Sequence, residues 1–245
     1  MWDEQDKNEF EKLTSRKVGQ ICNDSFSFYI YKLASDLSNK TFLEIGTWNG
    51  LGSTLAFSQG FKSRNDNYIF FSLECNKDKC EQAKLLYKSN KKMNILNEVI
   101  WNKEPDNFYD IFPQCKLNKT YERWNTVDII NMKKCNLFLD RENLPEIFDV
   151  LLLDGGEFTT YFEYKKLKDR CKYLLLDDIN TDKCKLIVRE LLNEPTKWEI
   201  LYSENVRNGF LIAINRKFKN EINFENLNID EAKNHYVSSR GIMKS

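Results

Sequence analysis

Three aspartates at the ends of two apolar runs are the clearest candidates for binding a metal ion. Asp154 ends the run in LLLDGGEF, and Asp177 and Asp178 end the run in LLLDDIN. Neighbouring parallel strands end side by side, so these carboxylates should converge and repel one another unless a cation or basic group is present. Ligand sets made only of oxygens suit Mg²⁺, Mn²⁺ or Ca²⁺. The pattern predicts a metal held by all three aspartates; the alternative is that Asp154 and Asp178 cap the helices that follow.

A glycine-rich segment, FLEIGTWNGLGST, is the second candidate for chemistry. Gly46 and Gly50 allow a ligand to approach the backbone, and Ser53 opens a helix whose first N–H groups lack partners. The order G-x-x-x-G-x-G differs from the G-x-G-x-x-G fingerprint of dinucleotide-binding proteins. We therefore expect a cofactor other than NAD along residues 44–54. The alternative is a strand-to-helix turn whose glycines serve only steric needs.

Glu74 ends the run FFSLE, where a carboxylate can accept hydrogen bonds from both hydroxyls of a ribose. Alone, it could equally cap the following helix near Asn76. With the glycine loop beside it, the cofactor role is favoured. Contacts to an adenine are expected just after the third strand, around Trp101 and Asn102.

The elements that position these residues alternate between short apolar runs and amphipathic segments, a pattern typical of βαβ units. Strands are predicted at 41–45, 68–74, 95–101, 148–154 and 173–177, and helices at 52–61, 77–87, 160–170 and 182–192. Two more β-like runs, 198–202 and 209–214, are joined by SENVRN and predict an antiparallel hairpin at the sheet edge. The fold class is α/β, a doubly wound, mostly parallel sheet with a C-terminal hairpin.

Three segments fall outside this repeating pattern. Residues 1–40 form a helical leader, residues 102–147 an insertion longer than an ordinary connection, and residues 216–245 a polar tail. The domain itself is predicted to span residues 41–215. The leader and the insertion are placed to cover a substrate, and the tail is either a docked arm or partly disordered.

Residues 41–214 resemble class I, Rossmann-like S-adenosylmethionine-dependent methyltransferases in element order and motifs. Their first motif is an acidic residue followed by a glycine-rich turn, which Glu44, Gly46 and Gly50 match. The resemblance implies a seven-stranded sheet, with the Glu44 carboxylate facing the aminoacyl end of the cofactor and the following backbone beside its ribose and methionine portion. The implied cofactor-binding residues are Glu44, Gly46, Thr47, Gly50, Ser53, Glu74 and Asp154.

The aspartates look like those of metal-dependent O-methyltransferases of the catechol and macrolide-sugar types, in which such residues hold a Mg²⁺ that binds substrate hydroxyls. This similarity implies O-methylation of a sugar or other small hydroxylated acceptor. The catechol type carries a lysine shortly after its first metal aspartate, whereas this chain has GGEFTTYFEYKK there. By position, Glu157 is the best candidate base beside Asp154, Tyr161 is weaker, and Lys165 lies too far along the helix. His235, the single histidine, is expected to be a surface residue.

Composition narrows the partners. Thirty-seven basic and 37 acidic residues cancel, so no overall field favours nucleic acid or an anionic membrane. The seven cysteines are scattered without metal-site or C-x-x-C spacing, and there is no secretory leader or long apolar run. We expect a cytoplasmic protein with reduced cysteines; whether it forms a homo-oligomer is left open.

Two other functions are retained. Without a lysine or histidine at the expected catalytic positions, the chain could be a non-catalytic cofactor-binding or partner subunit of the same fold. A nucleotide-sugar dehydrogenase is less favoured and would bind NAD.

Overall fold

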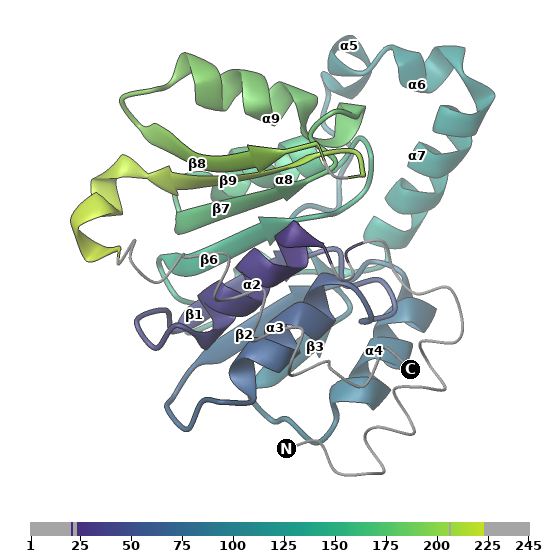
Figure 1. Ribbon diagram of the computed structural model, residues 1–245. Coiled ribbons are helices and arrows are strands. Elements are labelled where there is room, and N and C mark those ends of the chain that lie inside the picture. The colour runs from purple at the N-terminus through teal and green to yellow at the C-terminus, as the bar shows by residue number, and fades with distance from the viewer. Residues whose placement is uncertain (1–20, 22–23, 206, 223–245) are drawn as a thin grey trace, which may run out of the picture.

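A seven-stranded mixed sheet forms the centre of the protein (Figure 1). The computed structural model describes residues 21, 24–205 and 207–222. The strand order is β3-β2-β1-β6-β7-β9-β8, with β9 antiparallel to both of its neighbours and the other pairs parallel. The strands are β1 (Thr41–Ile45), β2 (Ile69–Leu73), β3 (Met93–Leu96), β6 (Phe148–Leu153), β7 (Cys171–Asp177), β8 (Trp198–Glu204) and β9 (Phe210–Asn215). The predicted doubly wound sheet and C-terminal hairpin are confirmed.

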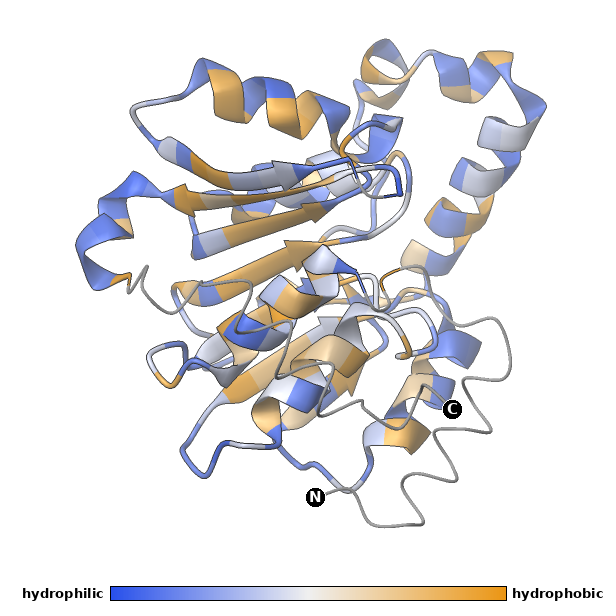
Figure 2. Ribbon diagram, in the orientation of Figure 1, coloured by the Kyte–Doolittle hydropathy of each residue, from blue (hydrophilic) through white to orange (hydrophobic). Residues whose placement is uncertain are grey.

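Helices cover both faces of this sheet, so its strands are apolar on both sides. One face packs against α2 (Ser25–Ser35), α3 (Ser53–Phe61) and α4 (Lys77–Tyr87). The other packs against α8 (Thr160–Leu167) and α9 (Asp182–Asn193). Along β6, Val150 and Leu152 join the first core while Leu151 and Leu153 join the second, as the two-residue period of a strand requires. Figure 2 shows the result, with hydrophobic strands inside and hydrophilic residues on the outer faces of the helices.

The predicted leader and insertion are both built into this architecture where the structure describes them. Helix α2 lies in the leader and packs against α3, and its N-cap Asp24 closes a capping box with Ser27. The insertion contains α5 (Phe108–Ile111), α6 (Gln114–Leu117), α7 (Lys119–Met132), β5 (Asn136–Leu137) and the short 3-10 helix Phe138–Asp140. Helix α7 lies at the end of the sheet toward which β6 and β7 point (Figure 1). The rest of the leader, residue 206 and the tail beyond 222, including His235, lie outside the described residues.

The predicted third strand, 95–101, was wrong in its boundaries. Strand β3 ends at Leu96, and the chain then forms β4 (Glu98–Val99), which pairs with β5 in a separate two-stranded sheet. The reason is Asn97, whose side-chain amide donates to the carbonyl oxygens of Glu74 and Cys75 at 2.7 and 3.1 Å. These bonds draw the chain across the end of β2 and out of the main sheet.

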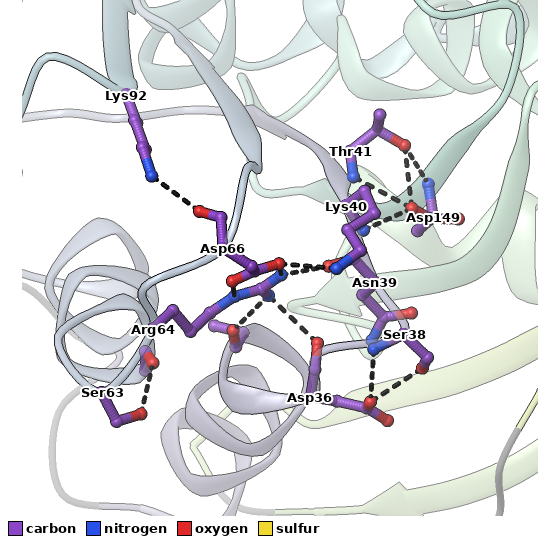
Figure 3. Close-up of polar contacts among 12 residues, drawn as sticks. Asp36, Ser38, Asn39, Lys40, Thr41, Ser63, Arg64, Asp66, Lys92 and Asp149 are labelled. Atoms are coloured by element: carbon purple, nitrogen blue, oxygen red, sulfur yellow. Dashed lines mark hydrogen bonds and ion pairs between the residues drawn. The ribbon is translucent and has the colours of Figure 1, made fainter.

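A charged network fastens the amino end of the sheet (Figure 3). Arg64, 6% exposed, donates to both carboxylate oxygens of Asp66 and to the carbonyls of Ala34, Asp36 and Asn39 at distances of 2.7–3.0 Å. These bonds use all five N–H groups of the guanidinium. Arg64 therefore joins the end of α2, the turn after α3 and the chain that enters β1.

No helix in the described part of the chain combines the length and apolar character that crossing a membrane requires. The six cysteines found there are free, and five of them are buried. Packing agrees with the prediction for five of these six, and their reduced state stays a prediction; Cys22 lies outside the described residues.

Candidate active site

A cavity of about 560 Å³ opens at the carboxyl ends of the parallel strands. Its wall combines the loop after β1, the ends of β2, β6 and β7, one side of α7 and the beginning of α9. Ile21, the one described residue in the first part of the leader, also lines it. Of the residues predicted to bind cofactor or metal, the cavity is lined by Gly46, Thr47, Ser53, Glu74, Asp154, Asp177 and Asp178.

The glycine loop has steric reasons for its glycines as well as a place at the cavity. Gly46 has φ +99°, and a Cβ there would lie 2.0 Å from the carbonyl oxygen of Asp154. Gly50, at φ +81°, faces Ala83 and Tyr87 of α4 and does not line the cavity. The prediction that Gly50 contacts cofactor is therefore not supported. The missing side chain of this glycine instead leaves space for helix α4 to pack.

Glu74 is positioned by backbone groups on both of its sides. One carboxylate oxygen accepts from the Trp48 amide at 2.6 Å, and the other accepts from the Asn76 amide at 2.8 Å. The side chain lines the cavity, and burial raises its pKa. Each oxygen keeps a second lone pair, so a fixed carboxylate is presented to any ligand in the cavity.

Glu44 lies beneath the cavity, whereas the resemblance had placed it against the cofactor. It is fully buried and accepts hydrogen bonds from the hydroxyls of Thr54 and Ser72. Burial raises the pKa of this carboxyl to about 7. Its side chain joins β1 to β2 and to the start of α3, so it supports the loop without lining the cavity.

The three predicted metal-binding aspartates do converge. Asp154, Asp177 and Asp178 each offer a carboxylate oxygen, and these oxygens lie within 4.8 Å of one another. Consecutive side chains of a strand point to opposite faces, and here the left-handed backbone of Asp178, at φ +56°, changes that direction. The alternative that the aspartates cap helices is not supported for α9, whose N-cap is Thr181.

Two basic side chains reach the same carboxylates. The Lys183 ammonium donates to Asp154 at 2.7 Å and to Asp178 at 2.6 Å. Arg207 donates through Nη1 to both oxygens of Asp177 at 2.9 and 3.0 Å. Burial and the neighbouring aspartates nevertheless raise the pKa of Asp177 to about 7. The carboxylate cluster is thus charge-paired by residues of this chain.

A further carboxyl enters the cavity from α8. Glu163 is 3% exposed, and its Oε2 has no hydrogen-bond partner among the described residues. Burial, with a contribution from nearby Asp128, raises its pKa to about 8, so it is mostly neutral at pH 7. Gly155 and Gly156 make room, because a Cβ at these positions would lie 2.6 Å from Glu163 and 2.4 Å from Asp128. A neutral carboxyl can donate a hydrogen bond to a ligand.

Comparisons with known proteins agree with this architecture. No protein-family model and no curated protein sequence matches the chain. An O-methyltransferase from Bacillus cereus, solved in complex with SAH, matches with a TM-score of 0.53 and 13% identity over 88% of this chain and 92% of that chain. A methyltransferase from Geobacter sulfurreducens matches with a TM-score of 0.51 and 10% identity over 88% and 91% of the two chains. The chain has the Rossmann-like methyltransferase fold.

Within this methyltransferase fold, a second hollow of about 480 Å³ adjoins the cavity. It is lined by Arg123, Trp124, Val127, Asp128 and Glu157, and two of these, Val127 and Asp128, line the main cavity as well. Glu157, the predicted base, therefore belongs to the outer hollow and not to the cavity where Asp154 lies.

The weaker candidates for the base are engaged elsewhere. The Tyr161 hydroxyl donates to Glu190 at 2.5 Å, and Lys165 pairs with the same carboxylate at 3.1 Å. Trp101 and Asn102, the expected adenine contacts, do not line the cavity. Trp101 packs its ring against Phe162, and Asn102 donates to the carbonyl oxygen of Cys135.

Asp128, Glu163 and Lys183 are among the cavity residues that sequence reasoning missed. Lys183 left a signal, since a lysine in the first turn of a helix opposes the helix dipole and requires a compensating anion. Asp128 and Glu163 left none, because each is an ordinary acidic residue of an amphipathic helix.

Proposed function

We propose that this protein is an S-adenosylmethionine-dependent methyltransferase that acts on a hydroxyl of a sugar or other small acceptor in the cytoplasm. The observation that carries the proposal is the cavity at the strand ends, where the Gly46 loop and the fixed carboxylate of Glu74 face each other within the methyltransferase fold. The strand order adds weight, because dinucleotide-binding folds continue with parallel strands where this chain inserts antiparallel β9.

The cavity fits this cofactor in size and in charge. Its volume of about 560 Å³ lies within the range of small-molecule sites. Acidic side chains outnumber basic ones on its wall, and two of them, Glu74 and Asp128, lie outside the charge-paired aspartate cluster. Such a wall favours a ligand that carries positive charge, and the sulfonium and ammonium groups of S-adenosylmethionine supply it.

The residues of the chain have distinct tasks in this proposal. Bound S-adenosylmethionine supplies a methyl group activated by the positive sulfur. Glu74 accepts hydrogen bonds from the ribose hydroxyls, while Gly46, Thr47 and Ser53 border the rest of the cofactor. Asp154 orients the acceptor, and Glu157, in the hollow that shares Val127 and Asp128 with the cavity, takes the proton of the acceptor hydroxyl through one bridging water.

The predicted divalent metal would find suitable ligand atoms in the aspartate cluster but not a vacant position. Asp154, Asp177 and Asp178 have the oxygen donors that Mg²⁺ prefers, and they lie close enough together. The ammonium of Lys183, however, already lies between two of them. As they stand, these residues do not fit a metal ion.

Calorimetry tests the proposal. The wild-type protein should bind S-adenosylmethionine and its demethylated product saturably, and should ignore NAD. Glu74→Ala should weaken binding about 100-fold, since two hydrogen bonds to a charged group are lost. Glu81→Ala, which removes an exposed carboxylate from α4, is the control and should bind as the wild type does. The absence of heat with either cofactor form would contradict the proposal.

Turnover separates an enzyme from a non-catalytic relative. Transfer of a radiolabelled methyl group should be measured against a panel of sugars and catechols, using protein whose cofactor binding has been confirmed. Transfer to sugars supports the proposed acceptor class. Cofactor binding without transfer to any hydroxylated acceptor would favour the non-catalytic subunit.

A further inference from the structure

The carboxylate cluster at the ends of β6 and β7 already contains a cation in the place where a metal would bind. Lys183 Nζ lies 2.7 Å from Asp154 Oδ1 and 2.6 Å from Asp178 Oδ2. A Mg²⁺ bound to the same two oxygens would have to lie about 2.1 Å from each, and would therefore overlap the ammonium. The two cations exclude one another at this position.

The surroundings of Lys183 favour the ammonium. The residue is 9% exposed and lines the cavity, so moving its charge away from the carboxylates would leave that charge buried without a partner. The third carboxylate, Asp177, has both oxygens engaged by Arg207, which also pairs with Asp24 at 2.7 Å. A metal ion would have to displace two basic side chains to gain all three aspartates.

The position of Lys183 along the chain supports the same conclusion. It follows Asp182 at the beginning of α9, after the N-cap Thr181. A positive charge in the first turn of a helix is unfavourable by a few tenths of a kcal/mol to about 1 kcal/mol. This lysine therefore does not stabilise the helix, and its ion pairs with the carboxylates explain why a lysine is found at this position.

We propose that Lys183 is the resident cation of this cluster and takes the place of a divalent metal in the active site. Two of its three N–H groups bind Asp154 and Asp178, and the third has no partner among the described residues. That N–H is available to bind the oxygen of the acceptor and to stabilise the negative charge that develops there. Its role toward the acceptor rests on the proposed function, whereas its exclusion of metal does not.

A Mn²⁺ titration followed by calorimetry tests the exclusion directly. Wild-type protein should show no saturable binding up to millimolar Mn²⁺. Lys183→Ala vacates the position and should gain a Mn²⁺ site whose Kd lies at least about tenfold below the millimolar limit set for the wild type. Adding Asp154→Asn to this variant should remove the site. Lys183→Met keeps the aliphatic stem and serves as the second variant if the alanine variant does not fold.

Lys172 offers a matched control at the opposite end of the sheet. It also bridges two carboxylates, Asp149 at 3.1 Å and Glu221 at 2.8 Å, but among the described residues no third acidic side chain completes a metal-binding group with them. Lys172→Ala should therefore gain no Mn²⁺ site. Saturable micromolar binding of Mn²⁺ to the wild type, lost in Asp154→Asn, would overturn the proposal.

The methyl-transfer assay gives a second readout. Wild-type activity should be unchanged by EDTA, and Lys183→Met should lose about 100-fold or more in kcat while its cofactor affinity stays within about threefold. Activity abolished by EDTA and restored by Mg²⁺ would overturn the proposal. Failure of the proposed function is seen separately, as the absence of cofactor binding, and leaves the Mn²⁺ titration interpretable.

Discussion

The sheet carries one charged network at each end, and the two differ in how completely their hydrogen bonds are used. At the amino end, all five N–H groups of Arg64 have partners (Figure 3). At the carboxyl end, one N–H of Lys183 and Oε2 of Glu163 have none among the described residues, and both side chains line the cavity. Saturation marks the first network as structural, and the unused donors and acceptors support the proposal that the second binds a ligand.

Of the substitutions that test this difference between the two networks, Arg64→Met should have the largest effect, a loss of stability. Its guanidinium is buried and paired with Asp66, so its loss leaves three carbonyls without this donor, while Asp66 stays paired with Lys40. We expect a loss of about 3 to 5 kcal/mol in the free energy of unfolding, measured by urea denaturation. Cofactor affinity of the folded protein should not change.

Arg216→Met is the control for that experiment. Arg216 is 41% exposed and pairs with Glu199 at 3.0 Å, so its loss should cost less than about 1 kcal/mol. A cofactor affinity that falls in Arg64→Met, measured where the variant is fully folded, would contradict the assignment of the amino-end network to structure alone.

A similar effect, on turnover, is expected for Glu157→Gln at the carboxyl end. If Glu157 accepts the acceptor's proton, kcat should fall about 100-fold while cofactor affinity and unfolding free energy stay as in the wild type. Steady-state kinetics with an acceptor that the wild type methylates provide the measurement. A fall of less than about threefold would remove Glu157 from the proposed mechanism.

Glu163→Gln should separate the two networks by their response to pH. Burial raises the pKa of Glu163 to about 8 in the folded protein, above its ordinary value. The folded protein therefore holds this proton more tightly than the unfolded chain does. Its contribution to the free energy of unfolding is complete at low pH and is lost as the pH rises toward 8. The glutamine variant should match the wild type near pH 4 and exceed it by about 3 kcal/mol at pH 7.

Urea denaturation across this pH range is the measurement for Glu163→Gln. Glu122→Gln, an exposed change on α7, should leave the pH dependence unaltered. An identical pH dependence in wild type and Glu163→Gln would show that Glu163 is charged when folded and has no proton to donate to a ligand.

The smallest effect is expected for Asp149→Asn at the amino end. Its Oδ2 accepts from the backbone amides of Lys40 and Thr41 at 2.6 and 2.9 Å, where β1 begins. An amide oxygen can replace part of this interaction, so the loss should be about 1 kcal/mol, with no change in cofactor affinity. Thermal unfolding with and without cofactor is the measurement; a loss above about 3 kcal/mol would show that the charge itself is essential.

The order of elements could be predicted from the sequence because it depends on local patterns. Continuous apolar runs such as LLLD read as strands covered on both faces, and β6 and β7 formed where expected. The end of β3 could not be predicted from the sequence, because it is set by the side-chain amide of Asn97, which donates to carbonyl oxygens just after the neighbouring strand β2.

The candidate site was predictable only where residues sit at strand ends. Glu74 and the three aspartates were found because parallel strands end together, so their convergence follows from topology. Glu44 was misplaced because sequence alone does not say which face of β1 its side chain takes. Lys183 was missed because its partners are defined by the turn after β7 and by β6, 29 residues away in the chain for Asp154.

Arg207 sets the order in which this molecule can be completed during synthesis. Its guanidinium clasps Asp24 at the start of α2 and Asp177 at the end of β7, and the residues in the first of these pairs are 183 positions apart. A nascent chain cannot form these two ion pairs until residues through Arg207 have left the ribosome. Until then Asp177 lacks its counter-charge, so the site matures only after nearly all of the sheet has been made.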